Sequence, residues 1–204
     1  MNADLLTVGV ELPGYHASAR MPADPVENKI HEDRLAKAMG FRGGLVPGVI
    51  VYSWMTHPVV EALGPAWLER GTFSVRFGKP VYFDEEAIVS VSVAARTDSA
   101  VTLNARVVDG KGETCGTATM ELSSEASPAA SNVGDYPAAP LPVERPPVSR
   151  AILESRTVLG TPDLMLDEPA SREFLERVSE TLSLYRGVGA AAHPGSTWTL
   201  RIVR

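Results

Sequence analysis

Two short segments of this chain carry residue types that could handle an acyl group. The first is Asn28-Lys29-Ile30-His31, in which the imidazole of His31 can take up and release a proton near neutral pH. The second is Val46-Pro47-Gly48-Val49, in which a glycine at the start of an apolar stretch lets the backbone approach a ligand closely. A base, an accessible backbone amide and a buried helix behind them together suggest a pocket for an acyl substrate.

Helical segments are predicted to hold these residues in place. Residues 27–39 carry apolar side chains at helical spacing and Gly40 ends the pattern, which predicts a short helix or irregular helical loop around His31. After a glycine-rich stretch, residues 49–55 are apolar almost all round, and a helix without a polar face belongs in an interior. We expect Pro58 to bend this helix or end it early.

Four later segments alternate apolar and polar residues with a period of two, which is typical of half-buried antiparallel strands. These segments are residues 73–77, 89–93, 101–107 and 117–122. Asp109-Gly110-Lys111-Gly112 predicts a hairpin turn between the last two, and a first strand is expected within residues 5–20. The pattern predicts an α+β fold in which one face of an antiparallel sheet covers the buried helix.

Three motifs together resemble a known family. Asn28-Lys29-Ile30-His31, the glycine-rich residues 40–48 and Arg76-Phe77-Gly78-Lys79-Pro80-Val81 are similar to the MaoC-like acyl dehydratases, the hotdog-fold group that contains the (R)-specific enoyl-CoA hydratases. The resemblance covers residues 5–122 and implies a hotdog fold, an antiparallel curved sheet wrapped around a central helix. It also implies a hydratase or dehydratase, a lyase that acts on an acyl thioester or a polyketide-like substrate.

The sequence departs from the pattern of this family at three places. The family places an Asp where this chain has Val26, and usually a Pro where it has Lys29. The central helix of the family begins His-Gly-Met, whereas this chain has Pro47-Gly48-Val49. The missing carboxylate weakens the catalytic assignment more than the fold assignment.

The resemblance implies a role for each candidate site residue. His31 would be the catalytic acid or base, and the amide of Gly48 would donate to the thioester oxygen. Asn28 would orient the water or His31. Glu27 is the carboxylate next to Val26, the residue that stands where the family has its Asp. The substrate-binding candidates are Gly43, Gly44, Pro47, Gly48, Tyr52, Ser53 and Tyr82.

The last part of the chain has a different texture. After a hotdog domain over residues 1–123, residues 124–149 are rich in Ala, Ser and Pro and predict a linker or a strap. Within residues 150–204 we expect a helix over 171–185, capped by Ser171. In this part the predicted helix is followed by Arg186-Gly187 and then by Pro194-Gly195. This order loosely repeats the order of helix, Arg-Gly and Pro-Gly around residues 41–48. It predicts either an incomplete second hotdog unit or a helical extension that covers a sheet edge.

Composition narrows the classes of partner. The 204-residue chain has a net charge of −6 and no Lys/Arg-dense run, which argues against nucleic acid, and no apolar stretch reaches the roughly 18 residues of a membrane span. Cys115 is the single cysteine, so no intrachain disulfide can form, and we expect a structural thiol in a cytoplasmic protein. His16, His57 and His193 lack ligand-like spacing, so no metal site is predicted. The resemblance implies no redox cofactor. CoA or an acyl carrier protein would arrive as part of the substrate.

Two other functions fit the same residues. A hotdog thioesterase would use Glu27 or Asp33 as its base, and a non-catalytic acyl-binding or structural subunit is favoured by the apolar Val26. In each case we expect a homodimer, because a single curved sheet on one helix leaves an apolar flank exposed.

Overall fold

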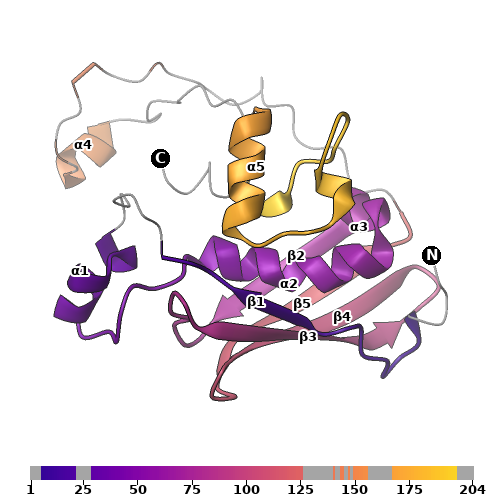
Figure 1. Cartoon of the computed structure of the whole chain (residues 1–204). Helices are drawn as coiled ribbons and strands as arrows, with labels where there is room; N and C mark the ends of the chain where they lie inside the picture. The colour runs from indigo at the N-terminus through magenta and orange to yellow at the C-terminus, as the bar shows by residue number, and fades with distance from the viewer. Residues whose placement is uncertain are drawn as a thin grey trace.

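The computed structural model describes residues 6–21, 29–125, 140, 143–144, 147, 149–155 and 167–196. These residues form a five-stranded sheet with the strand order β1-β3-β4-β5-β2, in which every neighbouring pair is antiparallel. The strands are β1 (Tyr15–Ser18), β2 (Gly71–Phe77), β3 (Glu86–Arg96), β4 (Ala100–Asp109) and β5 (Thr114–Ser123). The long helix α2 (Gly48–Leu63) lies along one face of this sheet (Figure 1).

The predicted strands and hairpin are confirmed. Along β3, Val89, Val91 and Val93 are at most 2% exposed, whereas the serines between them are only half-buried. At the turn after β4 the carboxylate of Asp109 accepts the N–H groups of Lys111 and Glu113, each at 2.9 Å. The apolar side chains of the strands therefore face α2, and the opposite face of the sheet is polar.

Helix α2 continues past Pro58 to Leu63, so of the two effects expected of Pro58, a bend or an early end, the early end is excluded. The residues from Ser53 to Val60 are all buried, and Trp54 and Met55 are at most 1% exposed. Burial of this surface between the sheet and the C-terminal segment stabilises the helix by more than one missing backbone hydrogen bond costs. The helix ends at Gly64, whose φ of +61° leaves the helical region, and α3 (Pro65–Arg70) follows.

The segment around His31 is an irregular helical loop. A single 3₁₀ turn, η2 (Lys29–His31), is followed by α1 (Asp33–Ala38). Glu32 separates them because its backbone is extended, with φ −92° and ψ 126°. The break leaves His31 at the end of the first turn, close to the loop that leads into α2.

The C-terminal part contains α4 (Arg150–Ser155), α5 (Glu168–Arg177) and the 3₁₀ turn η4 (Ser183–Tyr185). The prediction of one helix over 171–185 with Ser171 as its cap is wrong. Asp167 caps α5 through a bond from the Ala170 N–H to its Oδ1 at 2.9 Å. Ser179 has a φ of +57°, which no helix accommodates, so the helix ends before it. Most of the predicted linker at 124–149 lies outside the described residues.

Residues 167–196, called here the C-terminal segment, lie on the side of α2 that faces away from the sheet (Figure 1). The indole N–H of Trp54 donates to the carbonyl of Val178 at 3.1 Å, and the Tyr15 hydroxyl donates to the carbonyl of Ser179 at 3.0 Å. Phe174 is at most 7% exposed and belongs to the same apolar core. The helix α2 is therefore covered on both sides. No helix in the described ranges is long and apolar enough to cross a membrane.

Candidate active site

A cavity of about 390 Å³ lies at the N-terminal end of α2, between the His31 loop and the end of β2. Its lining is apolar except for His31 and Lys79. The lining residues are His31, Phe41, Leu45, Val46, Gly48, Val51, Phe77, Gly78, Lys79, Pro80, Val81 and Cys115. The sequence-predicted residues His31 and Gly48 therefore reach the same cavity, as an acyl pocket requires.

His31 is half-buried and its ring has a fixed partner. Its Nδ1 lies 2.6 Å from the carbonyl oxygen of Leu45. A carbonyl oxygen can only accept a hydrogen bond, so Nδ1 carries a proton, and in the neutral imidazole Nε2 is the nitrogen with the lone pair. The Leu45 N–H donates to the Ile30 carbonyl at 3.2 Å, which ties the loop to η2 a second time. The His31 ring is therefore held at the cavity by its own loop.

Gly48 is the first residue of α2, and its amide faces no acceptor among the described residues. The carbonyl of the preceding Pro47 accepts the N–H of Ile50 at 2.9 Å. A Cβ on Gly48 would lie 3.0 Å from the ring of Phe77, so a side chain at this position would crowd the cavity wall. The amide at the positive end of a 16-residue helix is a suitable donor to an oxygen that gains negative charge.

Gly43 and Gly44 are not among the residues that line the cavity. A Cβ on Gly43 would lie 2.8 Å from Oδ1 of Asp33, and one on Gly44 would lie 2.6 Å from the backbone oxygen of His31. The two glycines therefore let the loop pack directly against η2 and α1. They hold His31 in place, whereas the sequence predicted them as substrate contacts.

Four further predicted residues, Pro47, Tyr52, Ser53 and Tyr82, are not among the residues that line the cavity. The Ser53 hydroxyl donates to the Val49 carbonyl at 2.8 Å, on the side of α2 that the C-terminal segment covers. Tyr52 packs edge-on against Phe73 with ring centroids 4.7 Å apart, and burial raises the pKa of its hydroxyl. The Tyr52 side chain thus packs against the sheet, and the Ser53 side chain lies beside the C-terminal segment.

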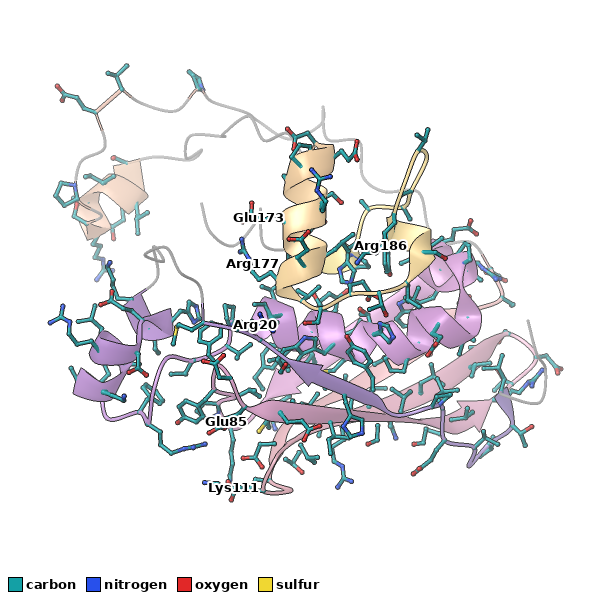
Figure 2. All side chains as sticks on the ribbon, viewed as in Figure 1. Arg20, Glu85, Lys111, Glu173, Arg177 and Arg186 are labelled. Atoms are coloured by element: carbon teal, nitrogen blue, oxygen red, sulfur yellow. The ribbon has the colours of Figure 1, made fainter. Side chains whose placement is uncertain are left out.

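Tyr82 lies beneath a charged group outside the cavity. The guanidinium carbon of Arg42 is 4.1 Å from the centre of its ring. Arg42 also makes an ion pair at 2.6 Å with Glu85, which is labelled in Figure 2. The pKa of the Arg42 guanidinium is raised, chiefly by this bond. The Arg42 head group is therefore held by Glu85 and Tyr82.

Val26, Glu27 and Asn28 lie outside the described residues. Asp33 is described, and its carboxylate faces Lys37 at 2.6 Å and the Gly44 amide at 3.3 Å. The bond from Lys37 lowers the pKa of Asp33, which makes it a weaker base. Asp33 does not line the cavity, so its position does not support the thioesterase alternative in which it is the base.

Sequence reasoning missed the role of Cys115 as a wall of the cavity. The register between β4 and β5 skips this residue, because Val107 pairs with Gly116 and Val108 pairs with Thr114. Such a bulge turns an extra side chain toward the core, and Cys115 is 1% exposed. Burial, followed by the nearby Asp109, raises the pKa of the thiol, as expected for a structural cysteine.

The comparisons with known proteins concern the fold. No protein-family model matches the chain, and no curated protein matches it. Among solved structures, a chain of the ChsH1-ChsH2 complex from Mycobacterium tuberculosis is 23% identical over 57% of this chain and 97% of that chain, with a TM-score of 0.50. The chain has a hotdog fold.

Other structures with this hotdog arrangement are similar at comparable identity. The (R)-hydratase from A. caviae involved in PHA biosynthesis is 21% identical over 57% of this chain and 96% of that chain, with a TM-score of 0.49. A MaoC-like dehydratase from Rhodospirillum rubrum is 18% identical over 61% of this chain and 97% of that chain, also with a TM-score of 0.49. The hotdog fold that the resemblance of the motifs implied is confirmed, and the reaction has to be inferred from the site.

Proposed function

We propose that this hotdog protein is a hydro-lyase that adds water to, or removes it from, an acyl thioester or a polyketide-like substrate. The observation that carries the proposal is the fixed tautomer of His31, whose Nδ1 is held by the Leu45 carbonyl beside the cavity. The same cavity is bordered by the Gly48 amide at the start of α2. In this proposal His31 is the base and the Gly48 amide is the oxyanion donor of one apolar pocket.

The reaction follows from these two groups. In the hydration direction, Nε2 of His31 takes a proton from water as the water oxygen bonds to Cβ of the α,β-unsaturated thioester. The negative charge that develops on the thioester oxygen is stabilised by the Gly48 N–H and by the positive end of α2. The imidazolium of His31 then returns the proton to Cα, so the product gains one hydroxyl and one hydrogen and the enzyme is unchanged.

The cavity lining supports an acyl substrate. Its walls are formed by apolar side chains such as Val51, Phe77 and Val81, which suit a hydrocarbon chain better than a polar ligand. Lys79 lies at the same cavity and pairs with Glu113 at 2.6 Å on the surface. The substrate would therefore place its acyl group inside and its carrier, CoA or an acyl carrier protein, outside.

We also propose that the protein is a homodimer that associates through β2, an edge strand of the sheet. The inward-facing residues of this strand are incompletely covered, since Phe73 and Val75 are half-buried and Phe77 is 42% exposed. A second copy paired along this edge would cover them and would close the open side of the cavity beside Phe77.

A second candidate function is acyl binding without turnover. It is favoured by the lining of the cavity, in which no described residue is a carboxylate that could share the water with His31. One experiment separates the candidates: crotonyl-CoA and longer enoyl-CoAs are mixed with the protein, and both the absorbance of the conjugated thioester and the release of free thiol are followed. Loss of the conjugated absorbance without thiol release supports the hydro-lyase. Thiol release would indicate a thioesterase, and tight binding with neither change would indicate a non-catalytic subunit.

A further inference from the structure

Asp33 touches the loop that fixes His31, although it does not line the cavity. Its Oδ1 accepts the backbone N–H of Gly44 at 3.3 Å, and its Oδ2 accepts the Lys37 ammonium at 2.6 Å. Gly44 precedes Leu45, whose carbonyl holds Nδ1 of His31. Asp33 is thus connected to the imidazole through one hydrogen bond, the backbone of Gly44 and Leu45, and a second hydrogen bond.

The absence of side chains at Gly43 and Gly44 is explained by the same contact. A Cβ on Gly43 would meet Oδ1 of Asp33 at 2.8 Å, so the carboxylate occupies the space that a side chain would fill. A Cβ on Gly44 would meet the His31 backbone oxygen at 2.6 Å. The loop is therefore pressed between the Asp33 side chain and the His31 main chain, where small shifts of either would move the Leu45 carbonyl.

We propose that Asp33 is a positioning residue that holds the Gly43–Gly44–Leu45 loop, and through it keeps the proton of His31 on Nδ1 and the lone pair of Nε2 available to the substrate. The proposal rests on the proposed function in assigning a catalytic use to that lone pair, whereas the tautomer itself does not depend on any activity. It gives this chain a carboxylate that acts through the backbone, at a site where no described carboxylate reaches the cavity.

The chemistry of Asp33 suits this role. The bond from Lys37, aided by the bond from the Gly44 amide, lowers the pKa of the carboxyl, which favours the ionised form of Asp33. An ionised carboxylate makes a stronger bond to a backbone N–H than a neutral acceptor does. The Lys37 side chain is 56% exposed and its ammonium donates to Asp33, so it can be removed while the Asp33 carboxylate stays in place.

Asp33→Ala, Asp33→Asn and Lys37→Ala test the proposal. The ¹⁵N chemical shifts of the His31 ring, assigned with the help of His31→Gln, report which nitrogen carries the proton in the neutral imidazole. We expect Asp33→Ala to lose the predominance of the Nδ1–H form and to lower kcat/KM for enoyl-CoA hydration by about tenfold. Asp33→Asn keeps an acceptor for the Gly44 N–H, and Lys37→Ala keeps the carboxylate, so both should retain the wild-type tautomer and stay within about threefold in kcat/KM.

The outcomes separate the positioning role from the reaction. A wild-type tautomer in folded Asp33→Ala would overturn the proposal, whatever the activity of that variant. If Asp33→Ala does not fold, a folded Asp33→Asn that has lost the Nδ1–H form would overturn it, and one that retains the form supports it. A wild-type protein that hydrates no enoyl-CoA contradicts the proposed function alone, because the tautomer measurement still decides the role of Asp33.

Discussion

His57 and Glu180 are 123 residues apart in the sequence and meet in the core, where Nδ1 of His57 lies 2.9 Å from Oε1 of Glu180. Their side chains are 7% and 2% exposed. The same oxygen accepts the N–H groups of Thr181 and Leu182, and Nε2 of His193 lies 3.6 Å from the other oxygen. This buried cluster ties the C-terminal segment, which includes Arg186 (Figure 2), to the middle of α2.

Glu180→Gln should destabilise the protein markedly. Removing the charge of a buried, hydrogen-bonded pair leaves its partners without compensation, and we expect a loss of about 3 kcal/mol in the free energy of unfolding. The matched control is Glu173→Gln, because Glu173 pairs with Arg177 at 2.7 Å on the exposed face of α5 (Figure 2) and should cost under about 0.5 kcal/mol. Urea unfolding followed by circular dichroism measures both. Equal midpoints for the two variants would show that the buried cluster does not hold the segment.

The same cluster predicts a loss of stability in acid. Burial by itself would raise the pKa of Glu180, but the contacts from His193 and His57 and the Leu182 amide hold it well below its ordinary value of 4.5. The folded protein therefore binds this proton less readily than the unfolded chain. The stabilisation is complete above about pH 4.5 and is lost as the pH falls toward the lower, folded-state pKa. Thermal unfolding between about pH 6 and pH 3 should show a steeper decline for the wild type than for Glu180→Gln, and parallel curves would contradict this explanation.

Much of the fold was predictable because its periodicity is strong. Alternation located all the strands that follow α2, and the apolar circumference of residues 49–55 located the buried helix. Of the two effects expected of Pro58, an early end of the helix does not occur, because tertiary burial outweighs the local cost of proline inside a helix. Ser171 was a plausible cap, but Asp167 lies one turn earlier and its carboxylate bonds to the Ala170 amide.

The candidate site was less predictable than the fold. His31 and Gly48 lie at one cavity as the motifs suggested, but Ser53 faces the C-terminal segment instead. The direction of a helical side chain depends on what covers each face of the helix, and residues far along the chain provide that cover here. The pairing of His57 with Glu180 was also not predictable, because the sequence around each residue gives no indication of its distant partner.

Gly44→Ala should disturb the site more than the fold. Its Cβ would lie 2.6 Å from the His31 backbone oxygen, so the loop or η2 must move, and we expect kcat/KM for enoyl-CoA hydration to fall at least tenfold. Gly78→Ala is the control, because Gly78 also lines the cavity but its Cβ would meet only the Cys115 oxygen at an ordinary 3.8 Å. Steady-state kinetics on both variants provide the comparison. Similar losses in the two would point to general crowding of the cavity.

Val75→Glu should dissociate the proposed homodimer. The substitution places a charge on the half-buried inner face of the edge strand β2, where the second copy would pack, and we expect the dimer dissociation constant to rise at least tenfold. Val188→Asp is the control, since Val188 is fully exposed on the C-terminal segment and away from β2. Sedimentation equilibrium gives both constants. A wild-type protein that stays monomeric at high concentration would contradict the proposed interface directly.

The most direct measurement compares the hydration of crotonyl-CoA by the wild type, His31→Ala and His16→Ala. His16 is an exposed histidine that pairs with Glu86 at 2.7 Å, so its loss leaves the cavity unchanged. If His31 moves the proton, His31→Ala lowers kcat/KM by about 100-fold or more, whereas His16→Ala stays within about twofold. A His31→Ala variant that hydrates crotonyl-CoA at the wild-type rate would contradict the account.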